Sequence, residues 1–351
     1  MLKTGIVKDN RYMKHDAGPY HPESPERLEV IYAMLEDSDM VGRFQMVPVR
    51  CADREEILLI HSPEYLDMVA GTEGMDFFSL DPDTSTSPGS YEAALLAAGG
   101  LCNAVDMVIS EKLDNAFALV RPPGHHAERG LGRGFCIFNN VAIAAKYALT
   151  KHNLKRILIV DWDLHHGNGT MHSFENDPSV LYFSTHQYPY YPGTGSLSQV
   201  GKGPGEGFTI NVPLPARHGD GEYTGIFEKV LKPVALEYNP QLILVSAGFD
   251  IHHDDPLGGM LVTPNGFAGL TRSLMEISEI CCGGRVVFTL EGGYDLRGLR
   301  ESVKAVLKEL SGLSKTDTYD IMSRADQQKL RRTAGQVVEV QRKYWKSLHF
   351  S

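Results

Sequence analysis

The chain has 351 residues and a formal net charge of −10, from 34 Lys and Arg against 44 Asp and Glu. Apolar residues make up 42% of the chain and charged residues 22%, a balance that is typical of a folded globular protein and too apolar for disorder. The acidic surplus argues against a nucleic-acid-binding protein, and no continuous apolar run reaches the ~20 residues of a membrane-spanning helix. We therefore expect a globular chain that binds neither nucleic acid nor a membrane.

The chain contains five cysteines: Cys51, Cys102, Cys136, Cys281 and Cys282. Their number is odd and no two form a CxxC pair, so the pattern favours neither a disulfide framework nor a cysteine-ligated zinc site. Residues 1–10 show no apolar core of a signal peptide. These features predict a reduced, cytoplasmic protein.

Short β-rich runs alternate with helical stretches along the chain. The expected strands span residues 115–120, 156–160, 180–184, 208–212, 242–246 and 286–290. The expected helices span residues 91–110, 140–151, 220–237, 263–280 and 296–310, with a further helix near 325–344. The runs 157–160 and 242–245 are continuously apolar, as in parallel strands covered on both faces. The alternation predicts a single α/β domain over residues 1–351, with a central parallel sheet flanked by helices.

The expected strand at 115–120 leads directly into a pair of histidines, in the segment RPPGHH at 121–126. Adjacent imidazoles suit general acid–base catalysis because histidine titrates near neutral pH. A histidine pair alone is more often incidental, so this segment gains weight only from the other strand ends.

The strand at 156–160 is followed by DWDLHHGN at 161–168, the most specific motif of the chain. Asp161, Asp163 and His165 lie at i, i+2 and i+4, so an extended backbone would point all three to one side. Two acids and a histidine that converge at the end of a buried strand are costly without a cation, and both residue types bind zinc. A capped strand end with solvated acids is the alternative interpretation.

Two further strand ends add an acid and a phenol. Asp250 ends the segment SAGFD at 246–250, and Tyr294 ends LEGGY at 290–294. Because ligands of open α/β sheets gather beyond the carboxyl ends of the strands, Asp250 could meet Asp163 and His165. Three protein ligands and one open position are typical of catalytic zinc sites. Taken alone, Asp250 could equally be a loop cap, and LEGGY a simple turn.

Together these motifs resemble those of the histone deacetylase superfamily, closest to its bacterial and class II members. The matching segments are HPESPERL at 21–28, RPPGHHA at 121–127, GFCIFNN at 134–140, DWDLHHGNGT at 161–170, PGTG at 192–195, AGFD at 247–250, DPLGG at 255–259 and LEGGY at 290–294. They run in family order from about residue 5 to residue 310. The resemblance implies a single domain of the arginase–deacetylase type, and we expect the segment 311–351 to be helical and packed on it.

The resemblance also implies a role for each matching residue. Three would bind the catalytic metal, either zinc or ferrous iron: Asp163, His165 and Asp250. His126 would be the general base and acid, with His125 as its electrostatic partner, paired with Asp161. Tyr294 would donate a hydrogen bond to the substrate carbonyl. Asn168 stands where class I members carry Asp, which favours a neutral His126 ready to act as a base.

Structural potassium ions and an acyl-lysine tunnel are further family features. The first potassium site would use Asp161, Asp163, His165, Ser184 and Thr185, and the second Phe174, Asp177, Val180 and Phe208. The tunnel and its rim would involve Gly134, Phe135, Tyr191, Leu257, Asp83 and His21. The remaining candidates are expected to be ordinary surface histidines: His15, His172, His252 and His253.

The implied activity is a zinc-dependent amidohydrolase that removes acetyl or other acyl groups from the ε-amine of lysine in proteins or peptides. Zinc would polarise the carbonyl and activate a water whose proton passes to His126. An acetylpolyamine amidohydrolase is the alternative, but Leu257 stands where the polyamine-specific member of the family carries Glu, which favours acyl-lysine. An arginase-like enzyme with two metal ions needs extra carboxylate ligands, and this chain lacks them around residues 161–168. A catalytically silent acyl-lysine reader is disfavoured because His126 and Tyr294 are both present. Homo-oligomer formation stays open.

Overall fold

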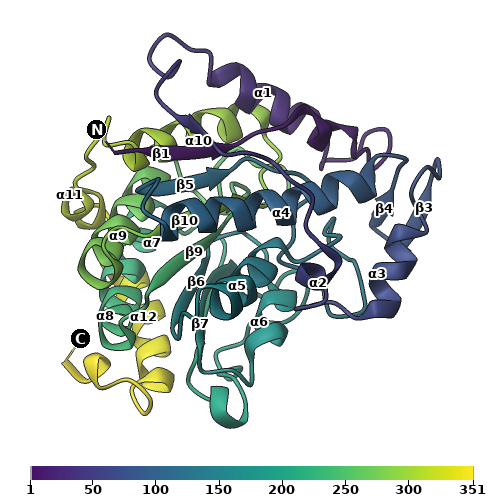
Figure 1. Ribbon diagram of the computed structural model, residues 1–351. Coiled ribbons are helices and arrows are strands. Elements are labelled where there is room, and N and C mark those ends of the chain that lie inside the picture. Colours follow the sequence, from purple (N-terminus) through teal and green to yellow (C-terminus); the bar gives the residue numbers. More distant parts are fainter. Residues whose placement is uncertain (1, 351) are drawn as a thin grey trace.

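A computed structural model describes residues 2–350, with only the backbone of residues 349 and 350. Within these residues, eight strands form one sheet in the order β2-β1-β5-β10-β9-β6-β7-β8 (Figure 1). These strands are β1 Thr4–Val7, β2 Gln45–Met46, β5 Asn115–Ala118, β6 Ile157–Asp161, β7 Val180–Gln187, β8 Thr209–Leu214, β9 Leu242–Ala247 and β10 Val286–Leu290. All neighbouring pairs in this sheet are parallel. An antiparallel hairpin of β3 Phe78–Asp81 and β4 Thr84–Thr86 stands apart from it.

Helices cover both faces of the sheet (Figure 1). They are α1 Glu26–Met34, α2 Arg54–Ile57, α3 Pro63–Ala70, α4 Ser90–Ile109, α5 Asn140–Lys151, α6 Asn168–Phe174, α7 Asp220–Ile226, α8 Lys232–Tyr238, α9 Pro264–Cys282, α10 Leu296–Leu310, α11 Thr318–Ser323 and α12 Gln327–Gln341. Short 3₁₀ turns span Asn10–Lys14, Gly203–Gly205 and Lys346–Phe350. The helices α4 and α5 contact one face of the sheet, while α9 and α10 contact strands from the other side.

The predicted α/β domain with a central parallel sheet is confirmed. All six predicted strands are present, with small shifts at their ends, and β5, β6, β9 and β10 are buried throughout. The predicted helix at 220–237 is not uniform, because a π-helical turn at Phe227–Leu231 joins α7 to α8. The continuously apolar strands β6 and β9 are buried along their whole length, so they are covered on both faces, as their composition indicates.

By length and composition alone, helix α4 could span a membrane, with a mean hydropathy of 1.5. However, 67% of that apolar window is buried inside the protein, and α4 contacts β1, β5 and β10. Core packing against the sheet therefore accounts for its composition.

The C-terminal segment packs on the edge strand of the sheet, as expected for a helical addition to the domain. α12 contacts β8 and buries Leu330 and Val337. The Nε2 of Gln341 donates to the carbonyl oxygen of Thr209 at 3.0 Å, so this segment covers backbone polar groups that an edge strand would otherwise expose.

Strand register brings the functional loops to one edge of the sheet. Asp161 at the end of β6 lies opposite Ser246 of β9, and Leu290 at the end of β10 lies opposite Ala247. β5 flanks β10 on its other side. The loops that follow β5, β6, β9 and β10 therefore start side by side at the carboxyl edge, where ligands of such sheets bind.

Candidate active site

The three predicted metal ligands lie together beyond the ends of β6 and β9. Asp163, His165 and Asp250 offer ligand atoms that all lie within 4.8 Å of one another. The Nδ1 of His165 is 3.2 Å from Oδ1 of Asp163 and 3.1 Å from Oδ2 of Asp250. Burial and the charge of Asp163 raise the pKa of Asp250 to about 7. Two buried acids so close together favour a cation between them, and one nitrogen and two carboxylate donors fit zinc with an open position.

Backbone amides hold the outer oxygen of each carboxylate. The amide of Gly292 donates to Oδ2 of Asp163 at 2.8 Å, and the amide of Leu164 donates to Oδ1 of Asp250 at 2.8 Å. The other oxygen of each acid then faces His165. A Cβ atom at Gly292 would overlap both carboxylates, so the LEGGY segment needs glycine at this position to approach the ligands.

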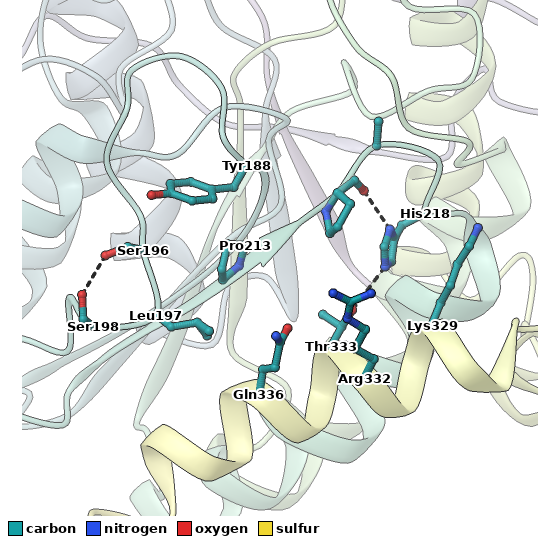
Figure 2. A pocket seen from close by; sticks show the side chains of 12 residues that line it. Tyr188, Ser196, Leu197, Ser198, Pro213, His218, Lys329, Arg332, Thr333 and Gln336 are labelled. Atoms are coloured by element: carbon teal, nitrogen blue, oxygen red, sulfur yellow. Dashed lines mark hydrogen bonds between the residues drawn. The ribbon is translucent and has the colours of Figure 1, made fainter.

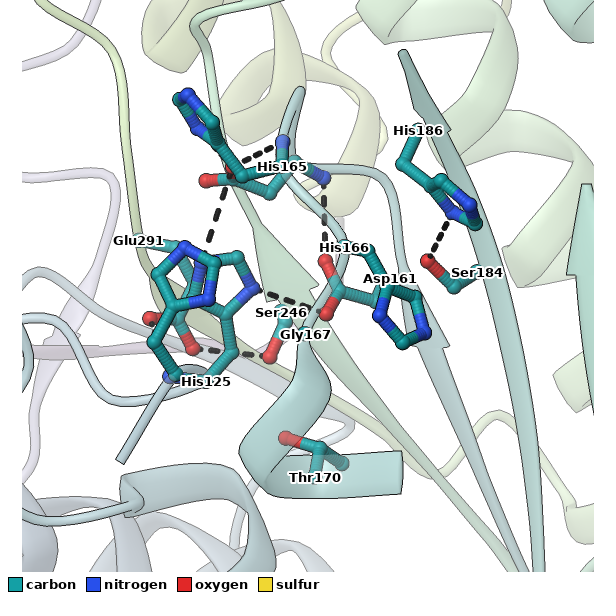
Figure 3. Close-up of polar contacts among 12 residues, drawn as sticks. His125, Asp161, His165, His166, Gly167, Thr170, Ser184, His186, Ser246 and Glu291 are labelled. Atoms are coloured by element: carbon teal, nitrogen blue, oxygen red, sulfur yellow. Dashed lines mark hydrogen bonds and ion pairs between the residues drawn. The ribbon is translucent and has the colours of Figure 1, made fainter. Parts of the chain in front are cut away.

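Asp161 does not join this cluster, and the expected extended backbone from Asp161 through His165 is wrong because β6 ends at Asp161. Its Oδ2 instead accepts a hydrogen bond from Nδ1 of His125 at 3.0 Å (Figure 3). The same oxygen accepts from the hydroxyl of Tyr182, also at 3.0 Å. Its Oδ1 accepts from the amide of Asp163 at 3.2 Å. Asp161 therefore orients His125 while supporting the backbone of a metal ligand.

His125 and His126 have opposite electrostatic environments although their ring centroids are only 4.0 Å apart. Burial lowers the pKa of His125, but the carboxylates of Asp163 and Asp161 outweigh it and raise that pKa to about 10. Burial, together with the neighbouring His125 and His165, holds the pKa of His126 well below its ordinary value of 6.5. The neutral His126 can therefore act as a base, while the cationic His125 beside it can act as its electrostatic partner.

A cavity of about 90 Å³ opens above these residues. From the predicted catalytic and metal set, its lining includes His125, His126, His165 and Tyr294. From the predicted tunnel, it includes Asp83, Gly134, Phe135, Tyr191 and Leu257. His21 is not part of this lining; its ring lies 4.6 Å from that of Phe135, and it lines a neighbouring hollow together with Tyr294.

Tyr294 enters the cavity from the loop after β10. Its amide donates to Oδ2 of Asp255 at 2.7 Å, and its ring packs edge-on against Phe135 at 5.9 Å. Burial raises the pKa of Tyr294 well above its ordinary value of 10, so the phenol keeps its proton at neutral pH. No residue of the part described by the structure hydrogen-bonds the hydroxyl, which leaves it available to a substrate oxygen.

The predicted potassium ligands fall into two groups. In the first, Asp161 lies opposite Ser184 in the β6–β7 pair, and Oγ1 of Thr185 is buried without a hydrogen-bond partner among residues 2–350. Ser184 itself hydrogen-bonds Nδ1 of His186 at 2.9 Å (Figure 3). In the second group, the carbonyl of Phe174 accepts from the amide of Asp177 at 2.9 Å. Val180 begins β7, and Phe208 immediately precedes β8. Both potassium sites stay predictions.

Glu291 and Tyr190 shape the site without having been predicted from the sequence. One carboxylate oxygen of Glu291 accepts from the amides of Gly124 and His125 at 2.7 and 3.2 Å, and the other accepts from Ser246 at 2.9 Å (Figure 3). Tyr190 stacks on His165 with centroids 5.7 Å apart. Glu291 belongs to the LEGGY segment, but its partners and those of Tyr190 lie far away in the sequence, so the local pattern did not indicate these contacts.

Two of the four histidines expected at the surface are buried. His15 is buried with Nδ1 2.7 Å from Oγ of Ser90, and His252 is also buried, because the loops around them fold inward. His172 and His253 are exposed as expected.

One hollow that is larger than the site cavity lies away from the predicted site. A hollow of about 650 Å³ lies between β8 and α12, with His218, Lys329 and Arg332 in its lining (Figure 2). It contains none of the predicted site residues.

Comparisons with known proteins show the family to which the chain belongs. A sequence profile described as the histone deacetylase domain matches residues 21–310. The chain is 41% identical to histone deacetylase HDA1 of Candida albicans, over 99% of this chain and 45% of that protein. It is 39% identical to a protein of Archaeoglobus fulgidus named "Probable deacetylase", over 98% of this chain and 99% of that one.

Other relatives carry names with different substrates. The chain is 46% identical to polyamine deacetylase HDAC10 of Danio rerio, over 83% of this chain and 44% of that protein. It thus spans about half the length of several eukaryotic relatives.

The solved structure named "Crystal Structure of HDA15 HD domain" superposes with a TM-score of 0.91 at 38% identity, covering 99% of this chain and 97% of that one. The chain therefore belongs to the histone deacetylase family and is a deacetylase, a hydrolase of a metal-dependent family.

Proposed function

We propose that this enzyme is a zinc-dependent amidohydrolase that removes acetyl or other acyl groups from the ε-amine of lysine in proteins or peptides. The observation that carries the proposal is the triad of Asp163, His165 and Asp250, in which His165 lines a cavity that also presents His126 and Tyr294. Zinc held by this triad would supply Lewis acidity, which polarises the amide carbonyl and makes a bound water more acidic.

The protein groups would then move the protons. His126 takes a proton from the attacking water at Nε2, since its Nδ1 is engaged by Asn168 at 2.7 Å. Tyr294 donates its hydroxyl to the carbonyl oxygen, an interaction that strengthens as negative charge develops there. The cationic His125, fixed by Asp161, favours the same build-up of negative charge. His126 finally returns its proton to the departing amine, giving a free amine and a carboxylate.

The metal and the compartment are further parts of the proposal. The donor set also suits ferrous iron, so metal analysis after anaerobic purification is needed to distinguish the two ions. Potassium in the two predicted sites would have a structural role. A cytoplasmic location is supported by the five cysteines, all of which are free.

For the substrate we propose acyl-lysine rather than acetylpolyamines, although relatives are named for each class. Leu257 lines the cavity and offers only apolar surface to the entering chain, which suits the flank of a lysine. Asp83 also lines the cavity and is an acid that could attract a second amine. Its Oδ1 already accepts a hydrogen bond from the amide of Gly134 at 3.1 Å. Turnover of an acetyl-lysine peptide should therefore exceed that of acetylputrescine and acetylspermidine.

Leu257→Glu should shift the ratio of kcat/KM toward acetylspermidine by roughly fivefold, the value of an exposed ion pair of up to ~1 kcal/mol with the second amine. Leu257→Gln is the matched control, because it has the same size without the charge. Steady-state kinetics on both substrates measure the ratio. A wild type that prefers acetylpolyamines, with a ratio that Leu257→Glu leaves unmoved, would contradict the substrate proposal.

A further inference from the structure

A chain of polar contacts leads from His126 outward to the protein surface. Nδ1 of His126 lies 2.7 Å from Oδ1 of Asn168, and Nδ2 of Asn168 lies 2.6 Å from Oε1 of Glu128. Nδ1 of His172 lies 2.9 and 3.1 Å from the two oxygens of Glu128. Glu128 is half-buried and His172 is exposed, so the chain begins in the cavity and ends in solvent.

The carboxylate determines which way the Asn168 amide faces. An ionised carboxylate can only accept hydrogen bonds, so the atom of Asn168 that meets Glu128 must be the NH₂ group. The amide oxygen then faces His126 and can only accept, which requires the proton of a neutral His126 to reside on Nδ1. Nε2 of His126 then carries a free lone pair and can take a proton.

A reversed amide would have the opposite effect. It would turn the oxygen of Asn168 against the Glu128 carboxylate and offer NH₂ to Nδ1 of His126. That arrangement selects the tautomer with the proton on Nε2, which cannot act as a base toward the cavity. Among the described residues, Glu128 aside, the one contact that opposes this reversal is the weaker one from Nδ2 of Asn168 to the carbonyl oxygen of His126, at 3.4 Å.

We propose that Glu128 is a positioning residue of the reaction, which fixes the Asn168 amide and through it the base-competent tautomer of His126. This inference rests on the proposed role of His126 as the general base. It assigns a function to a residue outside the cavity lining, at the sequence position two after the histidine pair. His172 holds the outer side of the same carboxylate and so restricts its rotation.

Removing the carboxylate should slow the chemical step. We expect Glu128→Ala to lower kcat by about tenfold, the loss of one charge-assisted hydrogen bond, with little change in KM because Glu128 does not line the cavity. Glu128→Gln should lose less, since its amide oxygen can still accept from Asn168. The matched control is Glu175→Gln, because Glu175 is also half-buried and pairs with Lys202 at 3.0 Å. This variant should leave kcat unchanged.

A double-mutant cycle separates this role from simple packing. In Asn168→Asp, two carboxylates would meet where the amide now donates at 2.6 Å, and like charges at that distance are strongly unfavourable. Glu128→Gln should therefore lower kcat in the wild-type background and raise it in the Asn168→Asp background. A change of the same sign and size in both backgrounds would overturn the proposal, and this outcome is readable even if Glu128→Ala fails to fold.

The tautomer can also be measured without turnover. In zinc-loaded protein with ¹⁵N-labelled histidine, ring nitrogen shifts should show His126 protonated at Nδ1, with the resonance assigned by its loss in His126→Phe. Glu128→Ala should shift these resonances toward the other tautomer, whereas Glu175→Gln should not. Unchanged His126 shifts in Glu128→Ala would overturn the proposal. A wild type that hydrolyses no acyl-lysine would instead reject the proposed function, and the shifts would still decide the role of Glu128.

Discussion

Asp163→Ala and Asp250→Ala are each expected to abolish deacetylation and to remove most of the bound zinc. Each change would delete one of the three proposed protein ligands and leave the other acid and His165 to hold the proposed ion alone. Outer-shell changes already cost ~10–100-fold in metal affinity, so loss of a direct ligand should exceed that range. Metal content per chain and kcat/KM on an acetyl-lysine peptide measure the two effects.

Asp254→Ala is the matched control for these variants. Asp254 is an exposed acid on the same loop as Asp250, and its carboxylate pairs with the neighbouring His253 at 3.3 Å. This variant should retain both zinc and turnover. Stoichiometric zinc with normal turnover in Asp163→Ala or Asp250→Ala would contradict the ligand assignment.

Tyr294→Phe should lower kcat by ~10²–10³-fold, by analogy with the loss of one oxyanion-hole donor. The ring and its contact with Phe135 remain, while the hydroxyl that faces no protein partner among the described residues is lost. KM should change much less, because the hydrogen bond strengthens chiefly in the transition state. Steady-state kinetics on an acetyl-lysine peptide separate the two parameters.

Tyr190→Phe provides the comparison for the loss of a phenol. Tyr190 also lies against His165, but its hydroxyl donates to the carbonyl oxygen of Leu257 at 2.9 Å rather than facing the reaction. A much smaller change in kcat is expected for this variant. If the effect of Tyr294→Phe were confined to KM, the phenol would bind substrate without stabilising the transition state.

Much of the fold and the central cluster of the site could be predicted because their signals are local. Continuous apolar runs identify β6 and β9 as buried parallel strands, and an acid lies within three residues beyond the end of each. The rule that ligands gather at the carboxyl edge of such a sheet then brings Asp163, His165 and Asp250 together. Buried acids are costly without a cation, and carboxylate and imidazole groups are ordinary zinc ligands. These two facts complete the prediction without any knowledge of side-chain conformation.

The remaining features depend on contacts that the sequence does not encode locally. β1 and β2 are too short to show a period, and the hairpin of β3 and β4 places Asp83 beside Gly134 through a contact between distant segments. The direction of Asp161 depended on where β6 ended, and the extended backbone assumed beyond it was wrong. Glu128 meets Asn168 only because α6 begins next to the histidine loop.

Zinc titration of metal-stripped enzyme tests the central claim most directly. The metal-free protein should not hydrolyse an acetyl-lysine peptide, and turnover should rise linearly with added zinc to a plateau at one ion per chain. Acetate and free lysine side chains should appear in equal amounts. Full turnover by metal-free protein, or a plateau that requires two ions per chain, would contradict a single zinc centre built on Asp163, His165 and Asp250.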